Sequence, residues 1–169
     1  MRILIRRIMP TTVKEGRMDP EAKLAELGIT LPTPTPPVAA YVPTVRTGSL
    51  VFISGQGPFK DGAFAYTGKV GRDVSLEEAQ DAARLTCIAG LAALKAEVGD
   101  LAKVSRVVKL TVFVNSAPGF DQQPLVANGA SELLQEVFGE SGRHARSAVG
   151  MAELPFNMPV EIEFIFEVL

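Results

Sequence analysis

The sequence predicts an α+β fold in which a single sheet is backed by two helices. Every second residue from Val160 to Val168 is apolar, and Glu161, Glu163 and Glu167 lie on the opposite face, which is the period of a strand with one buried face. Residues 75–98 and 124–138 carry apolar residues at helical spacing, and a glycine follows each segment. These helices interleave with β-rich runs in the order ββ(β)αβαββ, which is typical of a sheet with helices packed on it.

The length and composition predict one domain with a sizeable core. The chain has 169 residues, of which 47% are hydrophobic. Arg6 and Arg7 interrupt the apolar run that a secretory signal needs, so residues 1–17 are not expected to be one. We interpret them as an N-terminal extension before a start at Met18. A transit peptide is the alternative. The predicted α+β domain is therefore residues 18–169.

The first part of this domain predicts a short helix and an extended arm. Asp19 is a suitable N-cap, Pro20 suits the first helical position, and Gly28 is a plausible stop after a helix over 20–27. Residues 31–37 contain four prolines, which excludes regular hydrogen-bonded structure. We expect this arm to lie on the domain or on a neighbouring subunit.

The next segments predict a hairpin, a turn region and a long helix. Residues 41–46 and 50–54 read as strands around a glycine turn at 47–49, and a second turn region covers 61–68. Ser75 and Glu78 form the sequence signature of a capping box. The helix should end at Gly99, which suits a left-handed C-cap.

The remaining segments predict the centre of the sheet and its C-terminal strands. Residues 107–114 are apolar nearly throughout, as expected for a central strand. The tail, 144–168, reads as two strands joined by a turn at Leu154-Pro155. Helices should cover only one face of the sheet, while residues such as Val149 and Met151 make the other face apolar, so self-association is expected.

The charge, cysteine content and hydropathy of the chain argue against several classes of protein and site. The 17 basic and 19 acidic residues give a net charge of −2 with a pI near 5.5, which argues against nucleic-acid binding. The lone Cys87 allows no internal disulfide, which fits the cytoplasm. No apolar run reaches the length of a membrane span. No Cys/His cluster is present, so no metal site is predicted.

Arg146 and Glu161 are the leading candidates for chemistry. A guanidinium and a carboxylate on neighbouring strands could together hold a small carboxylic acid and a water. The structural alternatives are a surface ion pair for Arg146 and a solvated acid for Glu161. His144 could be a proton shuttle, although a structural or solvent-facing role is the more common one for a lone histidine.

Four segments carry motifs in the order of one known family. They are Ala40-Tyr41-Val42, V-F-I-S-G-Q-G-P at 51–58, Val126-Ala127-Asn128-Gly129, and A-R-S-A-V at 145–149 ahead of Leu154-Pro155 and V-E-I-E at 160–163. In this order they resemble the RidA/YjgF/UK114 family of reactive-intermediate deaminases, also called endoribonuclease L-PSP, over residues 37–169. The resemblance is to a branch with a longer N-terminus.

The resemblance implies a chorismate-mutase-like homotrimer with binding clefts between subunits. It implies hydrolytic deamination of 2-imino or enamine acids to 2-keto acids and ammonia, with no cofactor or metal. Arg146 would bind the substrate carboxylate, and Glu161 would orient or activate the attacking water. The other substrate-binding positions that it implies are Tyr41, Ser54, Gly55 and Asn128. Ala148 departs from the pattern, because many relatives have cysteine there.

Structural alternatives and two other functions stay open. Tyr41 could be a core or interface aromatic, Asn128 a helix cap, and Ser54-Gly55 a β-bulge. A non-catalytic trimer that binds small carboxylates would need Arg146 but not Glu161. An endoribonuclease or translation inhibitor is disfavoured by the acidic pI and the single histidine. The side chain of the imino acid and the role of residues 1–36 are left open.

Overall fold

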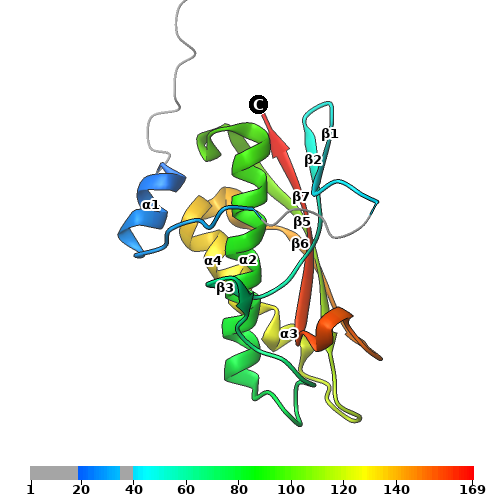
Figure 1. The fold of residues 1–169 in the computed structure, drawn as a ribbon. Coiled ribbons are helices and arrows are strands. Elements are labelled where there is room, and N and C mark those ends of the chain that lie inside the picture. The colour runs from blue at the N-terminus through cyan, green and yellow to red at the C-terminus, as the bar shows by residue number, and fades with distance from the viewer. Residues whose placement is uncertain (1–18, 35–39) are drawn as a thin grey trace, which may run out of the picture.

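The computed structural model describes residues 19–34 and 40–169, and it confirms the predicted α+β class (Figure 1). One five-stranded sheet contains β1 (Thr44–Thr47), β2 (Leu50–Gln56), β5 (Val104–Asn115), β6 (Ala145–Met151) and β7 (Val160–Val168). A separate small hairpin contains β3 (Phe59–Lys60) and β4 (Ala63–Phe64). The helices are α1 (Pro20–Glu26), α2 (Leu76–Val98), α3 (Gln123–Val126) and α4 (Asn128–Phe138).

Local capping signals place the helices where the sequence predicts them. The Asp19 side chain accepts a hydrogen bond from the Glu21 backbone N–H at the start of α1. The capping box of α2 is formed, with Ser75 Oγ accepting from Glu78 N at 3.2 Å and Glu78 accepting from Ser75 N at 2.8 Å. The second predicted helix is divided at Ala127 into α3 and α4.

The N-terminal predictions are only partly covered by the structure. The extension over 1–17, Met18 and residues 35–37 of the predicted arm lie outside the described residues. Leu31 packs against the core, and residues 32–34 line a shallow hollow together with Ala89 and Ala92 of α2. The described part of the arm therefore lies on its own domain.

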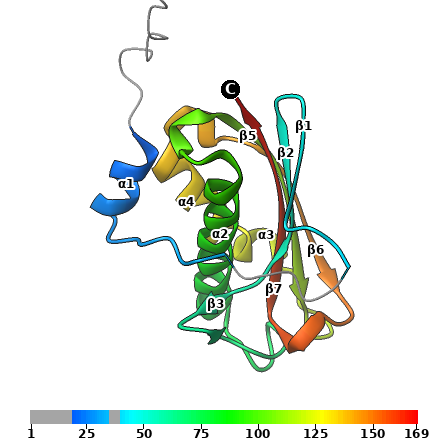
Figure 2. The same cartoon turned by 45° about the horizontal axis from the view of Figure 1, so that its top comes forward.

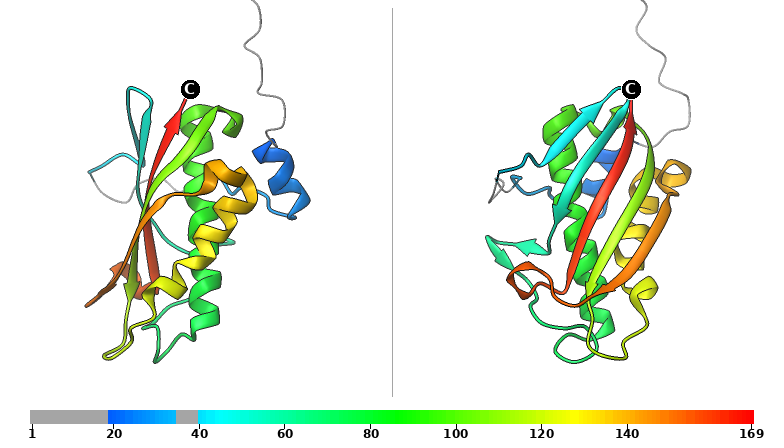
Figure 3. Two further views of the ribbon diagram at one scale, coloured as in Figure 1. Left: turned by 180° about the vertical axis from the view of Figure 1, so that it is seen from behind. Right: turned by 90° about the vertical axis from the view of Figure 1, so that its right-hand side faces the viewer.

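The sheet has the strand order β1-β2-β7-β5-β6, with β7 at its centre (Figure 3). β7 is antiparallel to both β2 and β5, whereas β6 is parallel to β5 and forms an edge. The prediction that the two C-terminal strands are neighbours is therefore wrong, since β5 lies between them. The physical reason is burial: β7 buries a full row of large apolar side chains, while most of β6 is half-exposed or exposed.

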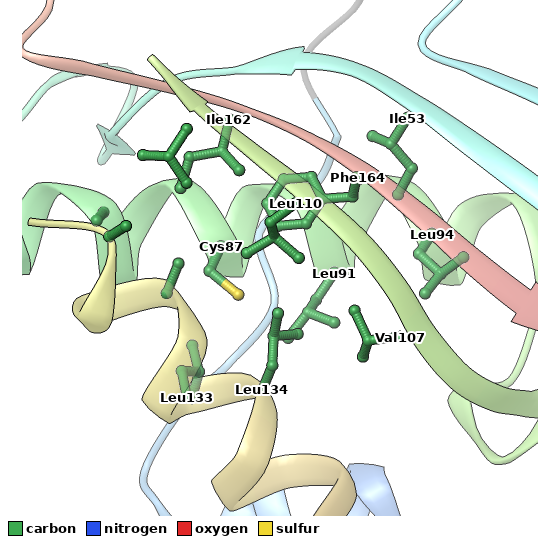
Figure 4. Close-up of a cluster of buried hydrophobic side chains, with 14 of the residues drawn as sticks. Ile53, Cys87, Leu91, Leu94, Val107, Leu110, Leu133, Leu134, Ile162 and Phe164 are labelled. Atoms are coloured by element: carbon green, nitrogen blue, oxygen red, sulfur yellow. The ribbon is translucent and has the colours of Figure 1, made fainter. Parts of the chain in front are cut away.

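The core lies between the sheet and the helices α2 and α4 (Figure 4). It includes Cys87, Leu91, Leu94, Leu110, Leu133, Leu134, Ile162 and Phe164. A Cβ built on Gly90 of α2 would lie 2.6 Å from the Phe164 ring, so this glycine permits close packing of helix on sheet. Burial raises the pKa of the Cys87 thiol, as expected for a packing residue rather than a nucleophile.

The helices lie on one face of the sheet, and the opposite face is open in this chain (Figures 2 and 3). Val149 and Met151 on β6 are exposed there, as predicted, and Phe52 on β2 is 40% exposed. Among the described residues, no helix is both long and apolar enough to cross a membrane.

Candidate functional site

Arg146 lies in a polar hollow where the start of β6 meets α3 and α4. Its Nη1 donates to Asn128 Oδ1 and to Ser131 Oγ, both at 3.0 Å, and its Nη2 donates to the Pro124 carbonyl at 3.1 Å. We call this the arginine hollow; it is lined by Asn128, Ser131, Glu132, Gln135, Arg143, His144 and Arg146. No ion pair of Arg146 occurs among the residues that the structure describes, which removes the surface ion pair as an explanation of its position.

His144 lines this hollow, and both nitrogens of its imidazole ring make hydrogen bonds. Its Nδ1 lies 2.6 Å from the Gly142 carbonyl and its Nε2 lies 3.1 Å from Ser131 Oγ. The carbonyl can only accept, so Nδ1 carries the hydrogen and Nε2 accepts from the Ser131 hydroxyl. Burial, and the nearby positive charge of Arg146, lower the pKa of His144. The neutral ring thus orients Ser131, which in turn accepts from Arg146.

Glu161 lies in a second hollow, where β2 meets β7. The register of β2 against β7 shifts between Ile53 and Gln56, which is a β-bulge at Ser54-Gly55. A Cβ on Gly55 would overlap Glu161 Oε1, so the glycine makes room for the carboxylate. Burial, and the charge of Glu163 two residues along, raise the pKa of Glu161.

Three other predicted site residues surround Glu161. Tyr41, Ser54 and Gly55 line the same cavity of about 490 Å³, together with several aromatic side chains. Tyr41 is 47% exposed and precedes β1, whereas Ser54 donates from both its N–H and its hydroxyl to the Pro43 carbonyl. We call this cavity the glutamate hollow. Of the predicted residues, only Asn128 joins Arg146 instead.

Within one chain the two hollows do not converge. Arg146 pairs with Leu110, which is buried under the helices, and its own partners belong to α3 and α4. Glu161 pairs with Phe113 and lies between the buried Val160 and Ile162, so it points to the open face. A single chain therefore places the guanidinium and the carboxylate on opposite faces, with β5 between their strands.

Sequence reasoning missed two groups of site residues. Ser131 lies three residues after Asn128 on α4, and this helical spacing puts both on the face that meets Arg146. The spacing could have revealed Ser131. The aromatic side chains of the glutamate hollow, Phe59, Phe64 and Phe156, belong to the β3–β4 hairpin and to the loop before β7. No local sequence pattern predicts that these two segments are in contact.

Comparisons with known proteins agree with this architecture. Residues 21–168 match the family described as "YjgF/chorismate_mutase-like, putative endoribonuclease". The chain is 46% identical over 158 residues to protein TCP17 of Trypanosoma cruzi, covering 93% of this chain and 98% of that protein. It is 36% identical to a 2-iminobutanoate/2-iminopropanoate deaminase of Salmonella typhimurium, covering 76% of this chain and 87% of the deaminase.

A solved structure resembles the fold closely. The protein Atu1372 of Agrobacterium tumefaciens, of unknown function, superposes with a TM-score of 0.82 at 52% identity, covering 88% of this chain and 91% of that chain. The fold and the two hollows define an α+β protein with a fixed guanidinium on an edge strand and a half-buried carboxylate at the start of the central strand. The chain belongs to the RidA/YjgF/UK114 family.

Proposed function

We propose that this protein hydrolyses 2-imino acids to 2-keto acids and ammonia, in a site that two copies of the chain complete. The observation that carries the proposal is the environment of Arg146. Three neutral acceptors fix its guanidinium in a hollow, and no carboxylate of the described residues neutralises it. A fixed cation of this kind suits an anionic substrate.

The remaining donors of Arg146 fit a carboxylate. A guanidinium has five N–H groups, and the three hydrogen bonds to Asn128, Ser131 and Pro124 use both hydrogens of Nη1 and one of Nη2. Nε–H and the second Nη2 hydrogen are left for a two-point contact with a carboxylate. The substrate's C2 would then be held at a fixed distance from this edge.

Glu161 suits the proton transfers of imine hydrolysis. Water adds to C2 of the protonated imine and gives up a proton to the carboxylate, which forms a tetrahedral amino alcohol. The carboxyl then returns that proton to the nitrogen, the C–N bond breaks while the hydroxyl gives its proton to the carboxylate, and ammonia and the keto acid leave; the carboxyl finally releases that proton to solvent. A raised pKa makes Glu161 a stronger base than an ordinary glutamate.

In this proposal, a second copy of the chain brings a guanidinium and a carboxylate together in one site. Because the two hollows face opposite sides of one sheet, Arg146 of one copy would meet Glu161 of another in a head-to-tail contact. Head-to-tail contacts that close make a ring, which is consistent with the homotrimer expected from the resemblance. The exposed apolar side chains of the open face, such as Phe52 and Val149, favour such a contact.

The test follows the decay of iminopropionate with purified protein. We expect acceleration by the wild type, and a loss of at least about 100-fold in kcat/KM for Arg146→Ala, because a charge-assisted two-point contact disappears. Arg72→Ala is the matched control, since Arg72 is exposed and pairs with the adjacent Asp73. Equal decay in buffer, wild type and Arg146→Ala would retire the proposal.

A non-catalytic carboxylate-binding protein is the second candidate. It is favoured by one fact, namely that the arginine hollow is fully organised without Glu161. Glu161→Gln separates the two functions: hydrolysis should be lost while binding of a keto acid survives. RNA cleavage has less support, because both ring nitrogens of His144 are engaged and its pKa is lowered.

A further inference from the structure

The wall of the glutamate hollow is aromatic, which bears on the substrate rather than on the reaction. Around Glu161 the cavity of about 490 Å³ is lined by the apolar side chains of Phe59, Phe64, Phe156 and Met158. A cavity of about 150 Å³ already holds a benzene ring. The space beside the carboxylate therefore exceeds what the methyl or ethyl group of a small imino acid needs.

The β3–β4 hairpin contributes two of these rings. Phe59 and Phe64 are directly opposite across the hairpin, and their ring centroids are 4.3 Å apart. Asp61 and Gly62 both have positive φ angles, of 52° and 84°, as a two-residue hairpin turn requires. The hairpin thus presents a fixed pair of rings to the hollow.

Phe156 contributes the third ring at the expense of backbone strain. Its φ of 55° and ψ of 19° are left-handed, which is unusual for a bulky residue, and the side chain is 66% exposed. Its ring stacks on Phe64 with centroids 5.6 Å apart. Folding alone gives little reason to hold an exposed phenylalanine in this conformation.

Buried hydrogen bonds keep this loop in place. Asn115, which is fully buried, donates to Asn157 Oδ1 at 3.2 Å and to the Met158 carbonyl at 3.3 Å. The Asn157 carbonyl accepts from Gly68 N at 2.7 Å, and Lys69 donates to Asn115 Oδ1 at 2.9 Å. The aromatic wall is therefore formed before any ligand binds.

We infer that the imino acids this site prefers carry a large apolar side chain, such as a benzyl group. This inference rests on the proposed function for its reaction, but the aromatic hollow alone predicts the preference in binding. With the carboxylate held by Arg146 of a neighbouring copy and C2 beside Glu161, the side chain at C2 would enter the cavity against the stacked rings of Phe64 and Phe156. Ring stacking and apolar burial would then favour it over a methyl group.

The experiment compares two substrates and two products on the full-length protein. An amino-acid oxidase generates the imino acids of alanine and phenylalanine, and calorimetry measures the dissociation constants of pyruvate and phenylpyruvate. We expect the phenyl compounds to be favoured at least tenfold in kcat/KM and in affinity. A ratio of the pyruvate to the phenylpyruvate dissociation constant below ten overturns the inference. Such a result is expected if side chains of a neighbouring copy fill the hollow.

Variants of the β3–β4 hairpin test whether the aromatic side chains cause the preference for phenyl compounds. Phe64→Ala should reduce the affinity ratio at least fivefold, and Phe64→Leu, which keeps most of the volume, guards against misfolding of the alanine variant. Lys60→Ala, on the same hairpin, should keep the ratio. An unchanged ratio in folded Phe64→Ala overturns the inference. Tight phenylpyruvate binding without imine hydrolysis supports the aromatic pocket and rejects the deaminase, whereas hydrolysis without preference does the reverse.

Discussion

Replacing Gly55 by alanine is expected to displace the Glu161 carboxylate without removing it. The new Cβ would overlap Oε1, and it would lie 2.7 Å from Cδ and 3.1 Å from Cγ of Glu161. Ordinary contact needs about 3.5 Å between heavy atoms, so the carboxylate must move by more than about 1 Å. Only the end of a flexible side chain stands in the way, so the backbone can remain as it is.

The size of the effect follows from this displacement. A shift of about 1 Å in a catalytic group can reduce the rate about 100-fold. Gly55 does not have a positive φ, so alanine introduces no backbone strain, and the free energy of unfolding should change by less than about 1 kcal/mol. Because Arg146 lies in the other hollow, binding of a keto acid should change much less than kcat.

The assay is imine hydrolysis by Gly55→Ala, Glu161→Ala and the double variant. If alanine acts only by moving Glu161, the double variant loses no more than Glu161→Ala alone. The chain contains no tryptophan, so circular dichroism rather than indole fluorescence checks that each variant is folded. A Gly55→Ala protein that keeps kcat within threefold, or losses that multiply in the double variant, would show that Gly55 does not act by making room for Glu161.

Three further outcomes follow from the same structure. Glu163→Gln should move the acid limb of the kcat/KM profile to lower pH, because the charge of Glu163 raises the pKa of Glu161; an unmoved limb contradicts this. Since the pKa of Glu161 is raised on folding, its charge destabilises the native state above that pKa, so Glu161→Gln should melt no lower than wild type at pH 7. Gly90→Ala should lose about 1–3 kcal/mol in denaturant unfolding, because its Cβ would lie 2.6 Å from the buried Phe164 ring; an unchanged midpoint contradicts the packing.

Local signals explain why the helices could be predicted from the sequence. The capping box at Ser75 and Glu78 and the N-cap at Asp19 are set by residues two or three positions apart. The alternation along β7 likewise identifies its buried face, because successive side chains of a strand point to opposite sides. Such features need no knowledge of the rest of the chain.

Strand order and the composition of the hollows could not be predicted in this way. Sequential strands are usually neighbours, and that expectation failed for β6 and β7 because burial places β5 between them. The same insertion separates Arg146 from Glu161. Phe64 and Phe156 lie 92 positions apart in the numbering, so only the folded chain shows that they stack.

The most direct test of a site shared between copies is complementation between two inactive variants. Arg146→Ala and Glu161→Gln are co-expressed with different tags, and mixed oligomers are purified through both. In a closed head-to-tail ring of three copies that contains both variants, one site in three, or about a third, receives an intact Arg146 from one copy and an intact Glu161 from another. If the site is shared between copies, the mixed trimers should recover about a third of wild-type imine hydrolysis. Mixed trimers that are as inactive as their parents would show that each copy carries its own complete site.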